Sequence, residues 1–431
     1  MKNLSLYIDA FTGIHEKTEK LRFFLILMLV FSLPFDLFYS SVILIGLFTT
    51  TLIDLNKEKI RRIPRQVWIF QLVYLLSIAG YFYSSHKNVA GFLLERQLSI
   101  FLLPIVLPIA VEIDQRKLEL LLRTLALSCF VTLAYLFAHM VYAIHWNLKL
   151  PLLHTALSGA FFNHQFSRPV GIHAGYLSLY VALSIFYLVQ VYTRISGSFG
   201  LRSVLIGALG VLFLGLFFLA SRNTVIGTFF ILIFISPLYN SKNKLRYISV
   251  SLLCFMSGFL LIKNTPYLHD RFSVELITDI KPRKNGAVNL NSAEPRYERW
   301  KGAYALIKRS PLIGYGTGDE IEMLRTEYVK RDLFISYIER FNAHNQYLSY
   351  LIKNGVLGLC VFLFAFGYFF YLAMRSRNFM YMSFLILLVI GFYTENILDA
   401  NKGIIFFALF NTFFGYAALK HSQKKAEETA S

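Results

Sequence analysis

Arginine residues at the ends of long apolar runs have the clearest potential for chemistry in this sequence. Arg222 lies in the short hinge Ser221-Arg222-Asn223, between two apolar runs. Its guanidinium group carries a permanent charge and a planar fork of N–H donors that matches the oxygens of a phosphate group. Such an arginine either anchors the chain at the lipid headgroups or belongs to an anion-binding site. The sequence leaves both interpretations open.

Two further arginines, Arg296 and Arg299, lie at the predicted start of an amphipathic helix. Pro295 directly precedes them, which is typical of a first helical position. Apolar residues then recur at helical spacing: Tyr297, Trp300, Ala303, Tyr304 and Ile307. Two guanidinium groups beside the unpaired N–H groups of a helix start suit a diphosphate. The alternative is a surface ion pair of Arg299 with Glu298 or Glu294.

His344 is the candidate general base. It lies in Asn342-Ala343-His344-Asn345-Gln346, where a polar segment leads back into an apolar run. An imidazole accepts a proton near neutral pH, so it could deprotonate an attacking hydroxyl group. Asn345 could orient the ring or bind substrate hydroxyl groups. The alternative is a polar cap at the membrane boundary.

Glu395 and His173 are weaker candidates for the same site. Glu395 lies with Asp399 between two apolar runs, where it could hold a hydroxyl group or pair with an arginine. His173 lies near the start of another apolar run. Both are predicted to contact substrate.

The remaining motifs favour a site without a metal or other cofactor. The glycine-rich stretch from Pro311 to Asp319 lacks the Lys-Ser/Thr pair of a P-loop, so we expect a tight turn and no nucleotide. No His, Asp, Glu or Cys cluster has metal-ligand spacing. The three cysteines, Cys129, Cys254 and Cys360, all lie within apolar runs and are predicted to be packing residues.

The composition identifies the elements that must position these residues. Of the 431 residues, 56% are hydrophobic and 16% are charged, whereas a soluble domain has about 45–50% apolar and about 25% charged residues. The apolar residues occur in runs of about 20, the length that crosses a bilayer as a helix. The sequence therefore predicts an all-α polytopic membrane protein.

About twelve membrane spans are predicted, and the first is interpreted as an uncleaved helix. They cover residues 21–34, 37–53, 67–85, 98–113, 120–144, 171–193, 203–220, 224–239, 247–263, 354–374, 379–394 and 402–419.

Basic residues predict the orientation of these spans. With a cytoplasmic amino terminus, the inner segments carry 22 Lys and Arg residues and the short outer segments carry six. Because Lys and Arg are retained in the cytoplasm, both termini are expected inside. The net charge of +18 is then mostly a topology signal, which gives no support for nucleic-acid binding and suits contact with membrane lipids.

One long segment is predicted outside the membrane. Residues 1–263 would hold the first nine spans, residues 264–343 the outer segment, residues 344–419 the last three spans, and residues 420–431 a cytoplasmic tail. The outer segment has 13 basic and 11 acidic residues. Its polar stretch from Asp279 to Glu294 is predicted to be a loop. We expect two amphipathic helices after it, the second from Asp319 to Phe341.

Three short motifs in this layout resemble those of the O-antigen ligase and polymerase superfamily of bacterial inner-membrane glycosyltransferases. The first is the Ser-Arg turn before the eighth span. The second is an arginine four residues before a tryptophan, followed by a Pro-Leu-hydrophobic-Gly-x-Gly turn. The third is His-Asn-x-x-Leu followed by Gly-hydrophobic-Leu-Gly. The matching residues are Ser221, Arg222, Arg296, Trp300, Pro311, Leu312, Gly314, Gly316, His344, Asn345, Leu348, Gly355, Val356, Leu357 and Gly358.

The resemblance implies a GT-C-like helical fold and an O-antigen ligase. Such an enzyme transfers a glycan, with inversion, from undecaprenyl pyrophosphate to a hydroxyl group of lipid A-core, without a metal. By resemblance, Arg222 and Arg296 would bind the diphosphate and His344 would act as base. The expected location is the bacterial inner membrane, with the site facing the periplasm and the protein a monomer.

Other functions stay open at this stage. A polysaccharide polymerase of the same superfamily often carries an arginine followed by glycine ten residues later in two outer loops, and no outer arginine here has that spacing. A protein O-oligosaccharyltransferase would share the donor chemistry. A secondary transporter or flippase also suits twelve spans, but it would be expected to place charges in the middle of its membrane helices.

Overall fold

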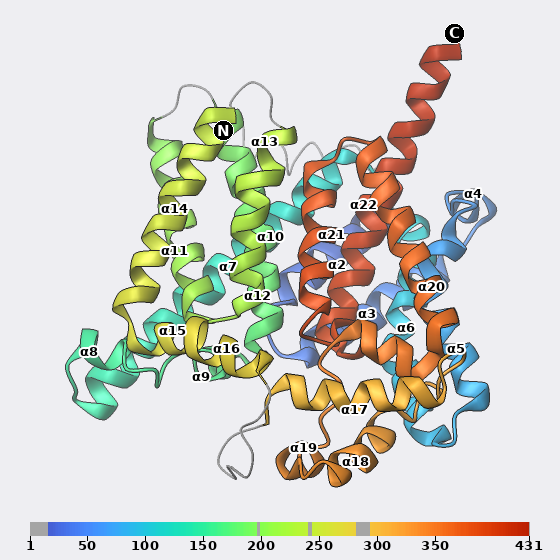
Figure 1. Cartoon of the computed structure of the whole chain (residues 1–431). Helices are drawn as coiled ribbons and strands as arrows, with labels where there is room; N and C mark the ends of the chain where they lie inside the picture. Colours follow the sequence, from blue (N-terminus) through green and yellow to red (C-terminus); the bar gives the residue numbers. More distant parts are fainter. Residues whose placement is uncertain (1–15, 196–198, 240–243, 282–293, 431) are drawn as a thin grey trace.

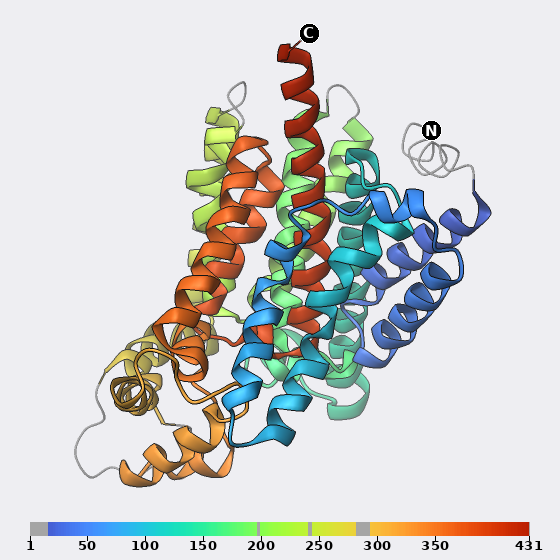
Figure 2. The same cartoon turned by 90° about the vertical axis from the view of Figure 1, so that its right-hand side faces the viewer.

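The computed structural model describes residues 16–195, 199–239, 244–281 and 294–430, and these form helices and turns without a strand (Figure 1). Long helices lie side by side in a bundle, and shorter helices cross one end of it, which is the lower end in both Figure 1 and Figure 2. The predicted all-α class is therefore confirmed for the described residues.

Seven helices are long and apolar enough to cross a membrane, by length and composition: α6 (Lys87–Ala110), α7 with its π-helical extension (Gln115–Leu148), α10 (Ala174–Arg194), α11 (Phe199–Phe218), α12 to α13 (Arg222–Tyr239), α20 (Gln346–Arg375) and α22 (Asn401–Gln423 of Asn401–Ala430). Four shorter apolar helices accompany them: α3 (Leu37–Ile53), α5 (Val67–Tyr83), the segment Ser251–Asn264 of α14 (Lys244–Asn264) and α21 (Phe379–Phe392). The first predicted span corresponds to α2 (Lys17–Ser32), of 16 residues. The chain is a multi-pass membrane protein, and the count of twelve spans stays a prediction.

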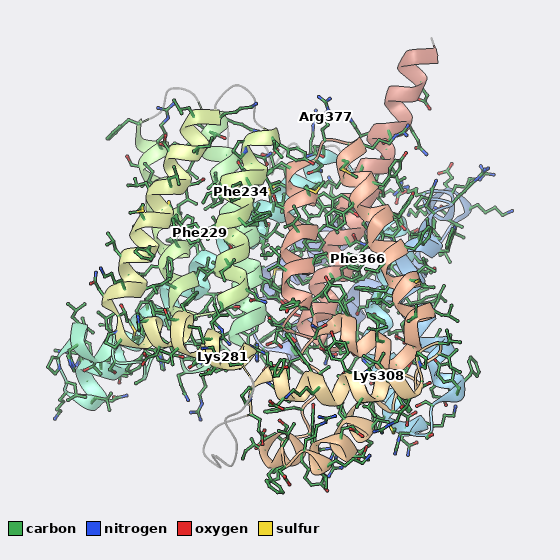
Figure 3. The ribbon with its side chains drawn as sticks, viewed as in Figure 1. Phe229, Phe234, Lys281, Lys308, Phe366 and Arg377 are labelled. Carbon is green, nitrogen blue, oxygen red and sulfur yellow. The ribbon has the colours of Figure 1, made fainter. Side chains whose placement is uncertain are left out.

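Aromatic residues hold the carboxyl-terminal half of the bundle together. Phe366 of α20, labelled in Figure 3, stacks on Phe407 of α22 at 5.7 Å between ring centroids. Phe384 of α21 contacts Phe410 of α22 at 6.3 Å. From Lys402 to Ala418, α22 is almost wholly buried between its neighbours. Because aromatic side chains bury large apolar areas, this packing gives a rigid base for the connections at the helix ends.

Short helices cross the end of the bundle, and the last three of them have a small core of their own. They are α15 (Pro266–His269), η5 (Asp270–Val274), α16 (Glu275–Ile280), α17 (Arg296–Arg309), α18 (Glu320–Lys330) and α19 (Phe334–Ile338). Leu306, Leu324 and Tyr328 pack there against Leu348 and Ile352 of α20. We call α17 to α19 the amphipathic layer.

The second amphipathic helix differs from its prediction. A single helix from Asp319 to Phe341 is wrong, because the chain turns after α18 and forms the short α19. Asp332 adopts a left-handed backbone with φ of 53°, and the Leu333 N–H donates to the Tyr328 carbonyl at 2.9 Å. The apolar spacing continues through this turn, so periodicity alone could not locate it. The helix predicted after Pro295 begins at Arg296 as expected, and residues 282–293 of the predicted loop lie outside the described residues.

The glycine-rich turn between α17 and α18 fixes this layer to the bundle. The N–H groups of Tyr315 and Gly316 donate to the carbonyls of Ile352 and Lys353, both at 2.8 Å. At Gly355 the backbone of α20 is kinked, with φ of 63°, and a Cβ there would lie 2.2 Å from the Leu312 carbonyl. Only glycine allows this close approach. The predicted tight turn is therefore confirmed, and two of the three short motifs form a single contact.

A buried ionic cluster lies beside this contact. The Lys353 Nζ lies 2.6 Å from an Asp399 carboxylate oxygen and 3.1 Å from Glu320. Glu320 also accepts hydrogen bonds from the Ser349 hydroxyl at 2.5 Å and from the Ala343 N–H at 3.2 Å. The cluster therefore connects α18, α20 and the turn before α22, and it fixes the backbone on both sides of His344 and Glu395.

Candidate active site

The Ser-Arg turn places Arg222 at the start of α12 (Arg222–Phe230). Ala220 has a left-handed backbone, with φ of 47°, and reverses the chain between α11 and α12. The Thr224 hydroxyl accepts a hydrogen bond from Ser178 of α10 at 2.9 Å. The Asn223 amide donates to the Thr394 hydroxyl at 2.6 Å. The turn is thus held from two sides, and the Arg222 side chain is 8% exposed.

Asp279 joins Arg222 to Arg296. One Asp279 carboxylate oxygen lies 2.5 Å from Nη2 of Arg222 and 2.9 Å from Nη1 of Arg296. The carboxylate is at the end of α16, and Arg296 is the first residue of α17. Two guanidinium groups that share one oxygen form a cationic site that can hold an anion with more than one oxygen.

Glu395 extends this network to His344. One Glu395 oxygen lies 3.8 Å from Nη2 of Arg296, and the other lies 3.6 Å from Nδ1 of His344. Glu395 follows α21 and is 30% exposed, while the His344 side chain is 27% exposed. The chain of contacts is therefore Arg222, Asp279, Arg296, Glu395 and His344. It brings together the three residues predicted from the motifs, and solvent reaches it.

The position of His344 depends on Trp300. The Trp300 indole N–H donates to the Ala343 carbonyl at 3.0 Å, directly before His344. His344 has a left-handed backbone, with φ of 44°, and its N–H donates to the Asn342 side chain at 2.9 Å. Arg296 and Trp300 lie one turn apart on α17, so the Arg-x-x-x-Trp spacing places a guanidinium group and a support for the imidazole on the same helix face.

Burial and neighbouring charges act in opposite directions on Glu395. Burial by itself would raise the pKa of this carboxyl group, whereas the neighbouring His344, with His173 and Arg296, lowers it. The net result is a pKa below the ordinary value of 4.5. Glu395 is therefore a carboxylate at neutral pH, able to hold the His344 ring in place.

His173 lies at the start of α10 near the same charges. Its Nδ1 accepts a hydrogen bond from the Gly175 N–H at 3.1 Å, and its ring lies 4.1 Å from that of His164. The surrounding protein and then the charge of His164 lower the pKa of His173 to about 4. His173 is thus neutral at pH 7, so it could serve as a hydrogen-bonding group but not as a counter-ion for phosphate.

Asn345 is occupied by the backbone. Its side-chain oxygen accepts from the N–H groups of Tyr347 and Leu348 at 3.0 and 3.1 Å and thereby caps α20. Its amide donates to the Tyr393 carbonyl at 3.1 Å. These contacts indicate that Asn345 holds α20 against α21. They do not support the predicted contact with substrate.

Arg299 is separate from the charged network. It is 6% exposed, and its guanidinium carbon lies 5.1 Å from the centre of the Phe341 ring. Burial lowers the pKa of this group. The surface pair considered from sequence is absent from the described residues, because Glu294 accepts from the Ser336 hydroxyl and N–H at 2.7 and 2.9 Å, while Glu298 pairs with Lys301 at 3.0 Å.

Sequence reasoning missed Asp279 as a member of the site. The sequence predicts a polar loop at this residue, because nothing in its spacing relates it to either arginine.

Within the described ranges, no group of three or more His, Cys, Asp or Glu residues is placed to hold a metal ion. The independence from metal stays a prediction.

The fold and this network define a multi-pass helical membrane protein with a cationic and imidazole-bearing site at one end of its bundle. Residues 207–363 match the model of a family described as O-antigen ligase. The matched range includes Arg222, Asp279, Arg296 and His344. The chain carries an O-antigen ligase domain, and the superfamily predicted from the short motifs is confirmed. No curated protein matches the chain.

Proposed function

We propose that this protein transfers a glycan from undecaprenyl pyrophosphate to a sugar hydroxyl group of lipid A-core, as an O-antigen ligase. The observation that carries the proposal is the network in which Asp279 and Glu395 connect two arginines to His344. A diphosphate needs fixed cations, and an attacking hydroxyl group needs a base within reach.

The proposal gives each of these groups a role. The acceptor oxygen forms a bond to C1 of the donor sugar while the bond from C1 to the diphosphate oxygen breaks, with inversion at C1. Undecaprenyl pyrophosphate leaves with the bonding electron pair, and Arg222 and Arg296 stabilise its charge. Because Nδ1 of His344 faces Glu395, Nε2 is the nitrogen that accepts the acceptor's proton.

Asp279 acts in this scheme as an internal stand-in for the diphosphate. Its carboxylate occupies the donors of Arg222 and Arg296, and it is 25% exposed. Donor binding would replace this carboxylate by phosphate oxygens. Like charges in the same position would otherwise repel, so Asp279 must move aside as the donor enters.

The proposed location is the bacterial inner membrane, with both termini in the cytoplasm and the site facing the periplasm. The distribution of Lys and Arg supports this orientation, because the inner segments hold most of them. Lipid-linked glycans are the substrates expected for the O-antigen ligase family. The proposed acceptor and inverting mechanism follow from the resemblance, and a monomer is the default expectation.

Glycan transfer by the purified protein in lipid nanodiscs tests the proposal. Arg296→Ala should lower the transfer rate by about 10²–10³, the typical loss of one group that stabilises a developing charge. His344→Ala should lower it by about 10²–10⁴. Arg309→Ala, at a half-exposed arginine of the same helix α17, and His154→Ala, at an exposed histidine, are the matched controls. Full activity of Arg296→Ala would reject the phosphate role.

The lipopolysaccharide profile of a deletion strain decides between the related functions. Loss of a ligase leaves unmodified core and accumulated lipid-linked polymer. Loss of a polymerase leaves core that carries one repeat unit. A normal profile with unglycosylated proteins would indicate a protein oligosaccharyltransferase.

A further inference from the structure

A large cavity lies at the end of the bundle opposite the candidate active site. Its volume is about 1120 Å³. It is lined by the amino-terminal part of α7, the carboxyl-terminal part of α10, the turn between α20 and α21, and α22. Arg377 lines the cavity. Figure 3 places it at the opposite end of the molecule from Lys281 and Lys308, which lie at the end with the candidate active site. The cavity is therefore distinct from the site described above.

The cavity has an excess of positive charge. Its lining includes Arg123, Arg194, Arg377 and Lys420, with only Asp114 and Glu119 as acidic residues. Several of these charges are already paired: Arg123 lies 3.8 Å from Glu119, Asp114 lies 2.8 Å from Lys117, and Lys420 lies 2.6 Å from Glu112.

Arg194 and Arg377 are the cations that the protein leaves without a carboxylate. In the part of the chain that the structure describes, none of the ion pairs involves either residue. Arg377 follows α20 in a left-handed turn, with φ of 47°, where helices commonly have glycine. Asn378 then caps α21 by accepting from the Tyr381 N–H at 3.1 Å. Two guanidinium groups from different helix ends thus remain for an external anion.

The rest of the lining combines polar side chains, among them Gln115, Gln190 and Ser376, with an apolar part that belongs to membrane helices. Leu118 and Leu122 of α7 face the cavity together with Val191 of α10 and Met380 of α21. A free phosphate ion would make no favourable contact with these apolar side chains. An amphiphile would place its charged headgroup on the arginines and its first methylene groups on the apolar wall.

We propose that this cavity binds the phosphate headgroup of an anionic phospholipid. Basic pockets between membrane helices are the sites at which headgroup phosphates bind. Arg194 and Arg377 supply the donors, and the apolar residues of α7, α10 and α21 hold the upper part of the acyl chains. In the orientation proposed above, the lipid comes from the inner leaflet. The site itself does not depend on the proposed reaction.

Native mass spectrometry of the full chain in detergent tests the proposal. The probes are phosphatidylglycerol and phosphatidylcholine with identical acyl chains. The wild type should bind phosphatidylglycerol with the higher affinity. The double variant Arg194→Gln/Arg377→Gln should lower that affinity by about tenfold or more, as expected for two lost charges near a membrane surface. Its affinity for phosphatidylcholine should change little.

A second pair of arginines provides the matched control. Arg61 and Arg375 are exposed, and neither lines the cavity. Arg61→Gln/Arg375→Gln removes the same charge and should lower phosphatidylglycerol binding by less than about threefold. Equal losses in both double variants would overturn the proposal, because they would indicate diffuse attraction.

Two further measurements separate the alternatives. Arg194→Lys/Arg377→Lys keeps the charge, and it should retain more phosphatidylglycerol binding than the glutamine pair; no difference between them would contradict a charged headgroup site. Inorganic phosphate at millimolar concentration should fail to displace phosphatidylglycerol. Displacement by phosphate would overturn the assignment to a lipid.

Discussion

Two ionic clusters at the same end of the bundle combine carboxylates with basic side chains in different surroundings. In the first, Lys353 lies 2.6 and 3.1 Å from two carboxylates, and all three side chains are about one-tenth exposed or less. In the second, Arg296, Glu395 and His344 are separated by 3.6 to 3.8 Å and are 20–30% exposed. The second cluster also has short contacts, because Asp279 lies 2.5 Å from Arg222 and 2.9 Å from Arg296. The difference therefore lies at Glu395, whose longer and accessible contacts leave Arg296 and His344 open to a substrate.

The two clusters also differ in what surrounds the cation. Lys353 lies between two carboxylates that also accept from backbone and side-chain groups. Arg296 shares the Asp279 carboxylate with Arg222 and lies beside the partly exposed Glu395. The comparison separates the cluster that holds the structure from the one that we expect to react.

The largest expected effect is on the buried cluster. Lys353→Met leaves Glu320 and Asp399 without their cation and should lower the free energy of unfolding by about 3–5 kcal/mol. Denaturation of the detergent-solubilised protein measures it. Lys301→Met removes a lysine from an exposed pair with Glu298 and should cost about 1 kcal/mol or less. Similar losses in the two variants would remove the distinction between the clusters.

A smaller effect is expected at Asp279. Asp279→Asn removes the carboxylate that occupies Arg222 and Arg296, so the donor should bind more easily. The KM for the lipid-linked donor should fall by about two- to fivefold, in line with the modest strength of a partly exposed ion pair. Steady-state kinetics with varied donor concentration measure it. A raised KM would instead mean that Asp279 holds the arginines in place for the donor.

The smallest effect concerns the dependence of stability on pH. Because the pKa of Glu395 is lowered in the folded protein, its charge contributes stability that is present above the ordinary value of 4.5 and lost as the pH falls through the lower folded value. The difference in the free energy of unfolding between wild type and Glu395→Gln should thus decrease as the pH falls below about 4.5.

Glu339→Gln, at an exposed glutamate outside the network, controls for the removal of a surface charge. If the free energies of unfolding of wild type and Glu395→Gln differ by the same amount at every pH, the Glu395 charge contributes nothing to stability.

The sequence by itself determined the class of the protein and the residue types of its site. Apolar runs of helical length are sufficient to predict membrane helices, because the bilayer admits few other structures. The spacing of Arg296 and Trp300, and the turn with Gly314, reflect local backbone geometry, so they could be identified from the sequence.

Only the tertiary structure decided which of these residues meet. Asp279 joins Arg222 to Arg296 although no local pattern relates them, and Arg299, three residues from Arg296, is buried apart from the network. The break at Asp332 and the capping role of Asn345 likewise could not be predicted from the sequence. The physical reason is that ion pairs between distant segments depend on how the helices pack, and the spacing of residues along one helix carries no information about that packing.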